Sequence, residues 1–346
     1  MTTTHGPATR GGVNASQPFS RPALFAISAT LIVVWGSAFT LVGLGVDHID
    51  PYWLTAGRLV VGAVFLAAYA LLRGHRFPPL RDPRWAWYSV LGLTGAVIPF
   101  ILMAVGQLTV DSGLTAVIVG AMPLLTIVLA HFFTAEKLTL WKVAGFVIGF
   151  CGVAVLFMPD EPGFGLTGDW VAQLIILAAA FCYAFTTVAA KRAPDTPAEV
   201  GAAMMIGAAA VAGVVAALVV KPVGFTPNGT AWFAIIALGF GSTGMATILY
   251  LTFIDRAGPS AMARLNYFPP MASVVFGVWL LDEDFTWKIA LAFVVIIIGV
   301  MISRRGSASP STPQTGSPGP HPGRGRPRPP VPALRARSSK GGPDRD

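Results

Sequence analysis

Residues 112–153, SGLTAVIVGAMPLLTIVLAHFFTAEKLTLWKVAGFVIGFCGV, contain two apolar runs joined by a short polar segment. Landmarks of this stretch recur 147 residues later in residues 259–300, PSAMARLNYFPPMASVVFGVWLLDEDFTWKIALAFVVIIIGV. The recurring pairs are Pro123 and Pro270, Glu136 and Glu283, Thr139 and Thr286, and Gly152-Val153 and Gly299-Val300. Self-similarity at a fixed spacing indicates an internal repeat.

The composition of the whole chain matches that of a membrane protein. Of its 346 residues, 54% are hydrophobic and 12% are charged, whereas soluble domains carry roughly 25% charged residues. A helix that crosses a bilayer needs about 20 predominantly apolar residues. The apolar runs predict an all-α membrane protein with ten transmembrane helices. The predicted spans are 23–45, 52–72, 86–106, 112–134, 140–158, 169–190, 199–220, 231–253, 259–281 and 287–303.

The repeat extends toward the N-terminus, where Ala38-Phe39-Thr40 recurs as Ala184-Phe185-Thr186. It predicts two five-helix units, residues 23–158 and 169–305, joined by a linker loop over residues 159–168. Because five is odd, the second unit enters the membrane from the opposite side. Inverted repeats are the architecture of many secondary transporters, in which two halves rock about a central site.

The distribution of Lys and Arg predicts a multi-pass protein of the cell membrane with both termini cytoplasmic. With the N-terminus inside, the inner segments hold Arg10, Arg21, Arg73, Arg76, Arg81, Arg84, Lys137, Lys142, Lys191, Arg192, Arg256, Arg304 and Arg305. The outer segments hold only Lys221 and Lys288 among basic residues. Eight of the sixteen acids fall on that outer side: Asp47, Asp50, Asp160, Glu161, Asp169, Asp282, Glu283 and Asp284.

Both ends of the chain are predicted to be disordered tails, over residues 1–22 and 306–346. The second tail contains ten prolines and seven glycines, and such a segment buries too little apolar surface to offset its chain entropy. It also supplies +5 of the net charge of +8. The net positive charge of the chain therefore comes mainly from a solvated tail, and no nucleic-acid partner is expected.

Several short motifs stand out in the two halves. They are Trp35-Gly36-Ser37-Ala38-Phe39, Pro51 followed by Arg58, Ser112-Gly113-Leu114, Pro123-Leu124, Ala130-His131, Glu136 and Gly152-Val153, with Pro270, Glu283 and Gly299 in the second half. Through these motifs residues 24–303 resemble the EamA family of the drug/metabolite transporter superfamily. The resemblance implies ten helices, cytoplasmic termini, a cavity between the halves and export of small metabolites, often amino acids or drug-like molecules.

Two departures separate the halves. Cys182-Tyr183 stands where the first half has Gly36-Ser37, and Met204 occupies the position equivalent to Arg58. The two halves are therefore not expected to be functionally equivalent.

Arg58 is the sharpest candidate for substrate binding. It lies seven residues past Pro51, about 10 Å into the membrane at 1.5 Å per residue. A cation at that depth needs a polar cavity, an acidic partner or the interface. It can bind a substrate carboxylate through its planar fork, pair with Asp47, Asp50 or Asp111, or snorkel to the surface.

Other polar and aromatic residues are candidates for a wet interior, although interfacial or interhelical roles compete for each of them. The substrate-binding candidates are Trp35, Ser37, Arg58, Gln107, Ser112, Thr115, Tyr183, Thr186, Tyr250, Arg264, Asn266 and Tyr267. Pro123 and Pro270 are predicted to kink their helices, either lining the cavity or serving packing alone. Thr139 and Thr286 are expected N-caps of the fifth and tenth spans. Glu136 and Glu283, just before these helix starts, complement the helix dipole.

The sequence thus predicts a secondary transporter that exports a small metabolite by alternating access. It predicts no catalytic residues, no metal and no cofactor. The expected partners are a small-molecule substrate and membrane lipid. Gly145-Phe-Val-Ile-Gly149 is suited to close helix contact within the chain or in a homodimer. The alternatives are a membrane enzyme or lipid-handling protein, which needs a clustered reactive set, and a receptor or scaffold that does not transport.

Overall fold

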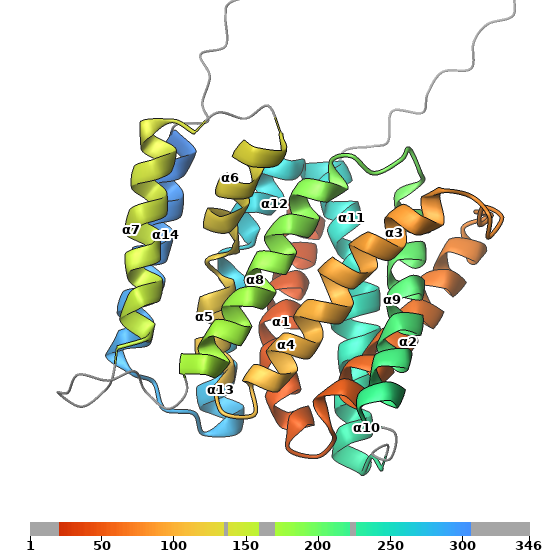
Figure 1. Ribbon diagram of the computed structural model, residues 1–346, viewed down its shortest axis with the longest axis horizontal. Coiled ribbons are helices and arrows are strands. Elements are labelled where there is room, and N and C mark those ends of the chain that lie inside the picture. The colour runs from red at the N-terminus through yellow and green to blue at the C-terminus, as the bar shows by residue number, and fades with distance from the viewer. Residues whose placement is uncertain (1–20, 135–137, 159–169, 222–225, 306–346) are drawn as a thin grey trace, which may run out of the picture. The chain divides into compact units, whose positions relative to one another are not determined.

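A computed structural model describes residues 21–134, 138–158, 170–221 and 226–305 (Figure 1). Within these ranges all regular structure is helical. The linker over residues 159–168 and both tails lie outside the described residues, except that Arg21 and Pro22 already belong to the first helix.

Fourteen α-helices and two π-helical segments make up the described chain. They are α1 (Arg21–Val46), α2 (Pro51–Leu72), α3 (Arg84–Gly92), η1 (Leu93–Val97), α4 (Ile98–Gly106), α5 (Ser112–Val119), α6 (Met122–Phe133), α7 (Leu140–Leu156), α8 (Trp170–Ala190), α9 (Ala198–Val220), α10 (Gly229–Ile236), η2 (Ala237–Met245), α11 (Ala246–Ala257), α12 (Pro259–Leu265), α13 (Phe268–Leu281) and α14 (Trp287–Arg305). Eight helical stretches of the described chain, one of them interrupted at Gly120-Ala121, are long and apolar enough to cross a membrane, and α7 and α13 are shorter apolar helices. The chain is a multi-pass, all-helical membrane protein.

Four predicted spans are not single α-helices. The span over 112–134 is broken at Gly120-Ala121 and the span over 259–281 at Asn266-Tyr267. Each break lies just before a helix whose first turn contains proline. Proline lacks an N–H and clashes with the carbonyl four residues earlier, so a helix begins there more easily than it continues through. The spans over 86–106 and 231–253 instead contain η1 and η2, glycine-containing π-helical segments.

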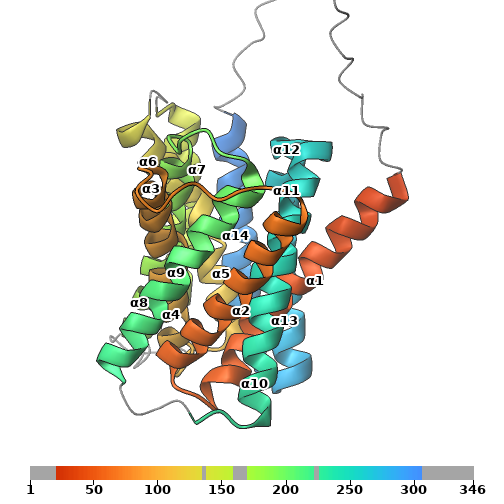
Figure 2. The ribbon, with the colours of Figure 1, turned by 90° about the vertical axis from the view of Figure 1, so that its right-hand side faces the viewer.

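Helices that are distant in sequence pair closely in space. α7 packs along α14 and α2 along α9, while α1 lies against α13 and α8 against α4 and α6. Figure 1 shows the α7–α14 pair at one side and the α2–α9 pair at the other. The start of α1 and the end of α14 lie on the same side of the molecule (Figure 2).

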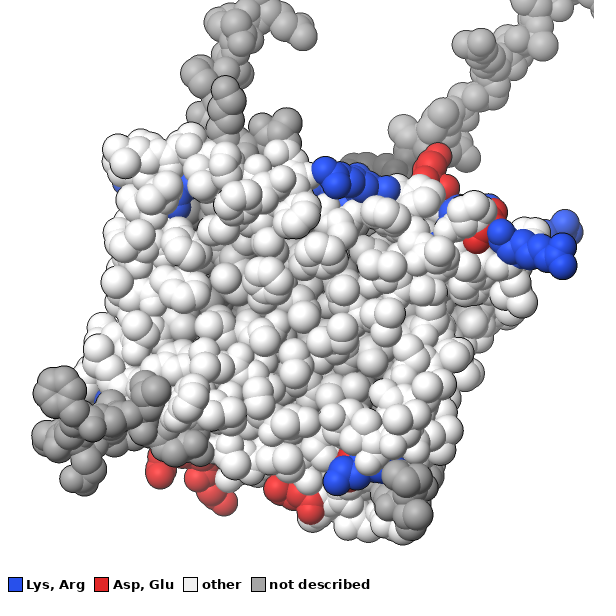
Figure 3. All heavy atoms as spheres, in the orientation of Figure 1, with Lys and Arg blue, Asp and Glu red and all other residues white. Residues whose placement is uncertain are grey.

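Charged side chains gather at the two ends of the bundle and leave an uncharged belt between them (Figure 3). One end, here the basic face, carries Arg73, Arg76, Arg192, Arg256 and Arg304 among its exposed residues. The other end, the acidic face, carries Asp47, Asp111, Asp282 and Asp284, with Lys221 as an exposed basic residue. The belt is the surface expected to face lipid.

The α7–α14 pair is held together by backbone contact at glycines. A methyl group at Gly299 would lie 2.5 Å from the carbonyl oxygen of Gly145 and 2.6 Å from the Cα of Gly149. Small residues allow membrane helices to approach this closely, which increases their dispersion contacts. The Gly145–Gly149 motif therefore packs within the chain, on α14.

This crossing predicts the effect of a single methyl group. Gly299→Ala should lower the free energy of unfolding by about 1–3 kcal/mol because the helices must separate. Gly207→Ala is the matched control, since Gly207 also lies within a helix but has no group within 4 Å of the added carbon. It should be neutral or slightly stabilising. Thermal melting followed by circular dichroism in micelles measures both variants, and equal melting temperatures would contradict the packing.

Candidate functional site

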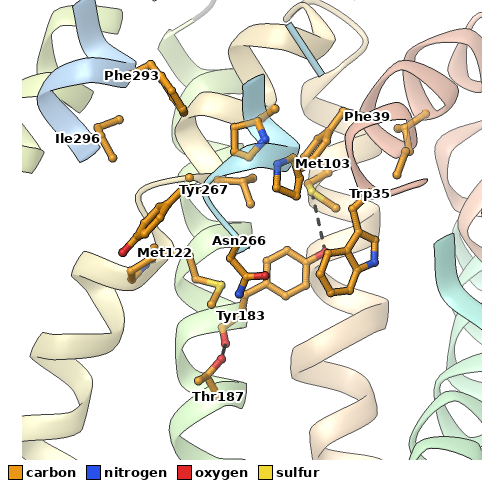
Figure 4. A pocket seen from close by; sticks show the side chains of 18 of the residues that line it. Trp35, Phe39, Met103, Met122, Tyr183, Thr187, Asn266, Tyr267, Phe293 and Ile296 are labelled. Carbon is orange, nitrogen blue, oxygen red and sulfur yellow. Dashed lines mark hydrogen bonds between the residues drawn. The ribbon is translucent and has the colours of Figure 1, made fainter. Parts of the chain in front are cut away.

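A cavity of about 390 Å³ lies among helices from both halves of the sequence. Its volume falls within the range of about 300–1,000 Å³ that is typical of small-molecule sites. Its walls are mainly aromatic and apolar, with Trp35 and Phe39 from α1, Tyr183 from α8, and Phe293 from α14. Figure 4 shows these side chains around the hollow, with the Tyr183 hydroxyl 3.9 Å from the sulfur of Met103.

Few polar groups line this cavity. They come from Arg58, Gln107, Thr186, Thr187 and Asn266, apart from the tyrosine hydroxyls. No acidic residue is among the described residues of the lining. Among the described lining residues Arg58 therefore supplies the one formal charge, which is positive.

Arg58 is held by hydroxyl groups and an aromatic ring. Its side chain is 7% exposed; its Nε donates to the Thr243 hydroxyl at 2.9 Å and an Nη to the Ser242 hydroxyl at 3.3 Å. The guanidinium carbon lies 3.7 Å from the centre of the Phe100 ring, a cation–π contact.

These contacts bear on the sequence-based alternatives for this residue. No ion pair joins Arg58 to an acid in the described part of the chain. Both hydroxyls belong to η2, which holds the guanidinium at the cavity wall. Two of the five guanidinium N–H groups are used in these bonds.

The two helix breaks meet at the cavity. Gly120, Met122 and Pro123 line it from one break, and Asn266 and Tyr267 from the other. Backbone that leaves the helical pattern at membrane depth is tolerated where it is buried in protein or faces a water-filled cavity. The breaks therefore place backbone polar groups next to the site.

The cavity is closed toward the acidic face. Glu283, in the loop after α13, caps the N-terminus of α5: its two carboxylate oxygens accept from Ser112 N at 2.7 Å and Gly113 N at 3.0 Å. The Ser273 hydroxyl donates to the Ser112 carbonyl at 3.3 Å. Gln107 is buried at this closed end, whereas Thr187 and Asn266 are exposed lining residues nearer the basic face. These two exposed residues of the lining therefore lie toward the basic face.

The capping pattern differs in part from expectation. Thr139 caps α7 as predicted, with its hydroxyl accepting from Lys142 N at 3.3 Å. Thr286 directly precedes α14. Glu283 caps α5 of the other half, not α14, because the chain reverses at Asp282 in a left-handed conformation (φ 53°). Glu136 lies outside the described residues.

The structure brings most of the candidate residues together. Those that line the cavity are Trp35, Arg58, Gln107, Tyr183, Thr186, Asn266 and Tyr267, together with Pro123 and Pro270.

Five candidates lie outside the lining. Ser37 donates to the Val34 carbonyl, and Tyr250 packs on Trp35 with ring centres 5.8 Å apart. Ser112 and Thr115 are buried in α5 behind the closed end, and Arg264 is exposed at the end of α12.

The sequence did not identify much of the apolar lining or the polar Thr187. Phe39, Met103, Met122 and Phe293 also line the cavity but look like ordinary residues of a membrane helix. Helical spacing could have identified Phe39, because it follows Trp35 by four residues and lies on the same face of α1. The side chains of α14 carried no comparable signal, because lipid-facing and cavity-facing positions there are equally apolar.

Comparison with known proteins agrees with this architecture. The family model of the EamA-like transporter family matches the chain twice, over residues 21–158 and 170–305. The chain belongs to the EamA-like transporter family. It is therefore a membrane transporter, and its relatives bear the names of transporters.

Relatives of this EamA-like transporter include three with informative names. It is 27% identical over 292 residues to the uncharacterized inner membrane transporter YedA of Escherichia coli (82% of this chain and 91% of that one). It is 27% identical over 286 residues to the aromatic amino acid exporter YddG of Ancylobacter novellus (82% and 98%). It is 30% identical over 258 residues to a probable terminal-alkyne amino-acid exporter of Streptantibioticus cattleyicolor (72% and 82%).

The fold is also shared with a solved structure. One crystal structure matches with a TM-score of 0.59 and 25% sequence identity, and the match covers 84% of this chain and 100% of the other. Among the described residues no group of three or more His, Cys, Asp or Glu is placed to hold a metal ion.

The Glu283 cap predicts a stability effect. Glu283→Gln replaces one of two acceptor oxygens with an NH₂ group that cannot accept from the α5 N–H groups. Loss of one charge-assisted bond should cost about 1–3 kcal/mol of unfolding free energy. Asp284→Asn, on an exposed neighbour, is the charge-matched control and should change little. Thermal melts of the two variants make the comparison, and the cap would be unimportant if both melted like the parent.

Proposed function

We propose that this transporter exports a small metabolite by alternating access, using ten spans arranged as two inverted five-helix repeats over residues 23–158 and 169–305, joined by a linker over 159–168. The observation that carries the proposal is the double match of one family model to the two halves. Each match covers one proposed repeat.

Corresponding features of the two halves support the inversion. A broken helix pair occurs as α5–α6 in the first half and α12–α13 in the second, and a π-helical segment occurs as η1 and η2. The packing of α1 on α13 corresponds to that of α8 on α6. α2 and α7 pack on their own proposed counterparts, α9 and α14, as expected for two modules related by a pseudo-two-fold axis.

The proposed orientation places both termini and the basic face in the cytoplasm, according to the positive-inside rule. The cavity is then open to the cytoplasm and closed toward the outside by the Glu283 contacts. This is the conformation in which an exporter takes up its substrate. Rocking of the two halves would exchange the open and closed ends.

The proposed role of Arg58 is to bind a carboxylate of the solute. The guanidinium is buried, has unused N–H groups and meets no acid in the cavity, so an anionic group would gain the most from it. Two relatives have names that specify amino-acid exporters, and amino acids carry such a carboxylate.

Labelling of loops tests the orientation. With Cys151→Ala and Cys182→Ala as the background, a cysteine at exposed Asp47 should react with a membrane-impermeant thiol reagent in intact cells. A cysteine at exposed Arg76 should react only after lysis, because it lies on the opposite face. Labelling of both positions from the same side would overturn the orientation.

Counterflow in proteoliposomes tests transport and the role of Arg58 together. The parent should exchange carboxylate-bearing solutes, and Arg58→Gln should weaken their binding by about ten- to hundredfold, the value of a charge-assisted hydrogen bond. Selectivity for a carboxylic acid over its neutral primary amide should fall by a similar factor. This ratio does not depend on how much protein is folded. An unchanged ratio would remove Arg58 from the binding site.

A further inference from the structure

The two helix breaks leave backbone carbonyl groups without their usual donors beside the cavity. In a continuous helix the Asn266 carbonyl would accept from the N–H four residues later, but that residue is Pro270, which has none. The corresponding donor for Gly120, the N–H of Leu124, bonds to the Ala121 carbonyl at 3.0 Å instead. No backbone N–H in the described part of the chain donates to either carbonyl. Both Gly120 and Asn266 line the cavity.

The two breaks come from opposite halves of the sequence and adjoin. A methyl group at Gly120 would lie 3.6 Å from the Cγ of Pro270. Gly120 has no side chain, and its N–H bonds to the Ala116 carbonyl at 2.9 Å. Its backbone therefore forms this part of the cavity wall, and the carbonyl is the polar group that it has left to offer.

The Asn266 side chain adds an oxygen that a solute can reach. The residue is exposed and lines the cavity, and Figure 4 shows its amide directed into the hollow. An amide oxygen accepts through two lone pairs. Trp35 and Tyr183 line the same hollow, and the faces of such rings attract cations. This part of the site therefore combines neutral oxygens with aromatic surface.

Neutral acceptors of this kind suit an ammonium group. An ammonium carries three N–H donors, which can bond to several oxygens at once. Unwound backbone carbonyls bind cations in this way in transporters built from inverted repeats. Arg58, in the same lining, offers only donors and a positive charge. The cavity therefore contains acceptors for a cationic group and donors for an anionic one.

We propose that the adjoining helix breaks bind a primary ammonium group of the solute through oxygens of Asn266 and Gly120, and that the substrate is an amino acid with an apolar side chain. This inference rests on the proposed transport function and names its substrate class. Asn266 is the specificity-determining residue of this subsite. Because its amide is neutral, an amine without a carboxylate finds no counter-charge to offset Arg58 in the described lining.

Binding of matched amino acids tests the ammonium subsite without requiring transport. The purified full chain is titrated with L-phenylalanine and with N,N,N-trimethyl-L-phenylalanine, and binding is followed by ligand-dependent thermal stabilisation. The two probes carry the same carboxylate and the same positive charge, but the second has no N–H group. The parent should bind phenylalanine about ten- to hundredfold more tightly, the effect of charge-assisted hydrogen bonds.

Two variants of similar size locate the effect. Asn266→Leu should reduce the preference to about threefold or less, because it removes the side-chain acceptor. Arg264→Ala is the matched control and should retain the preference, since Arg264 is exposed just before the same break and lies outside the lining. Asn266→Asp should raise the affinity ratio of phenylalanine to 3-phenylpropionate, which lacks the ammonium, by about tenfold, because an ionised acceptor bonds more strongly. Misfolding cannot produce such a gain.

Three results would overturn the proposal. They are equal or absent binding of the two amino acids by the parent, an unchanged preference in Asn266→Leu, and stabilisation by sodium chloride over choline chloride that Asn266→Leu abolishes. The second would mean that the methyl groups are excluded by their size, and the third that the oxygens hold a metal cation. Failure of counterflow with the preference intact would instead reject transport and leave the ammonium subsite standing.

Discussion

The structure depends on the requirement that backbone polar groups find partners where water is absent. Continuous helices meet it along the lipid-facing belt. The chain leaves the helical pattern at Gly120-Ala121 and Asn266-Tyr267, and both places border the cavity. The N–H groups at the start of α5 are satisfied by Glu283 from the other half. The same requirement that forces the chain to be helical therefore limits where helices can break, because broken backbone is tolerated only where it is buried in protein or faces a water-filled cavity.

How far the sequence predicts this arrangement depends on whether a feature is local. Pro123 and Pro270 predict the helix breaks, because the missing N–H of a proline removes a backbone hydrogen bond within one helical turn. Arg58 was identifiable as a cavity residue because a lone cation at membrane depth has few alternatives. Its partners, Ser242 and Thr243, lie about 185 residues away in a π-helical segment. The pattern of apolar residues does not predict this segment. Ser112 and Thr115 are candidates that lie outside the lining of this cavity, because helical spacing does not show which neighbour covers a face.

The two halves share a scaffold and differ in chemistry. Arg58 of α2 lines the cavity, whereas Met204, at the equivalent position in α9, is fully buried at 0% exposure in an apolar cluster with Tyr88 and Leu91. A second arginine there would add a like charge to the interior without an acid to offset it. One cation in a shared hollow is thus consistent with a solute that presents one negative group.

The closed end sets the energetic demand of any rocking motion. Glu283 and Leu281 of the second half contact α5 and Gly43 of the first, and Ile176 packs on Gly106 across the same division. Opening the acidic face separates these pairs and exposes a carboxylate and two N–H groups whose bonds are each worth about 1.5–3 kcal/mol. Hydration offsets part of this free-energy cost, because the acidic face is solvated. The remainder must come from contacts that form as the basic face closes, including those around a bound solute. The differential affinity of a solute for the two conformations limits how far it can shift their equilibrium.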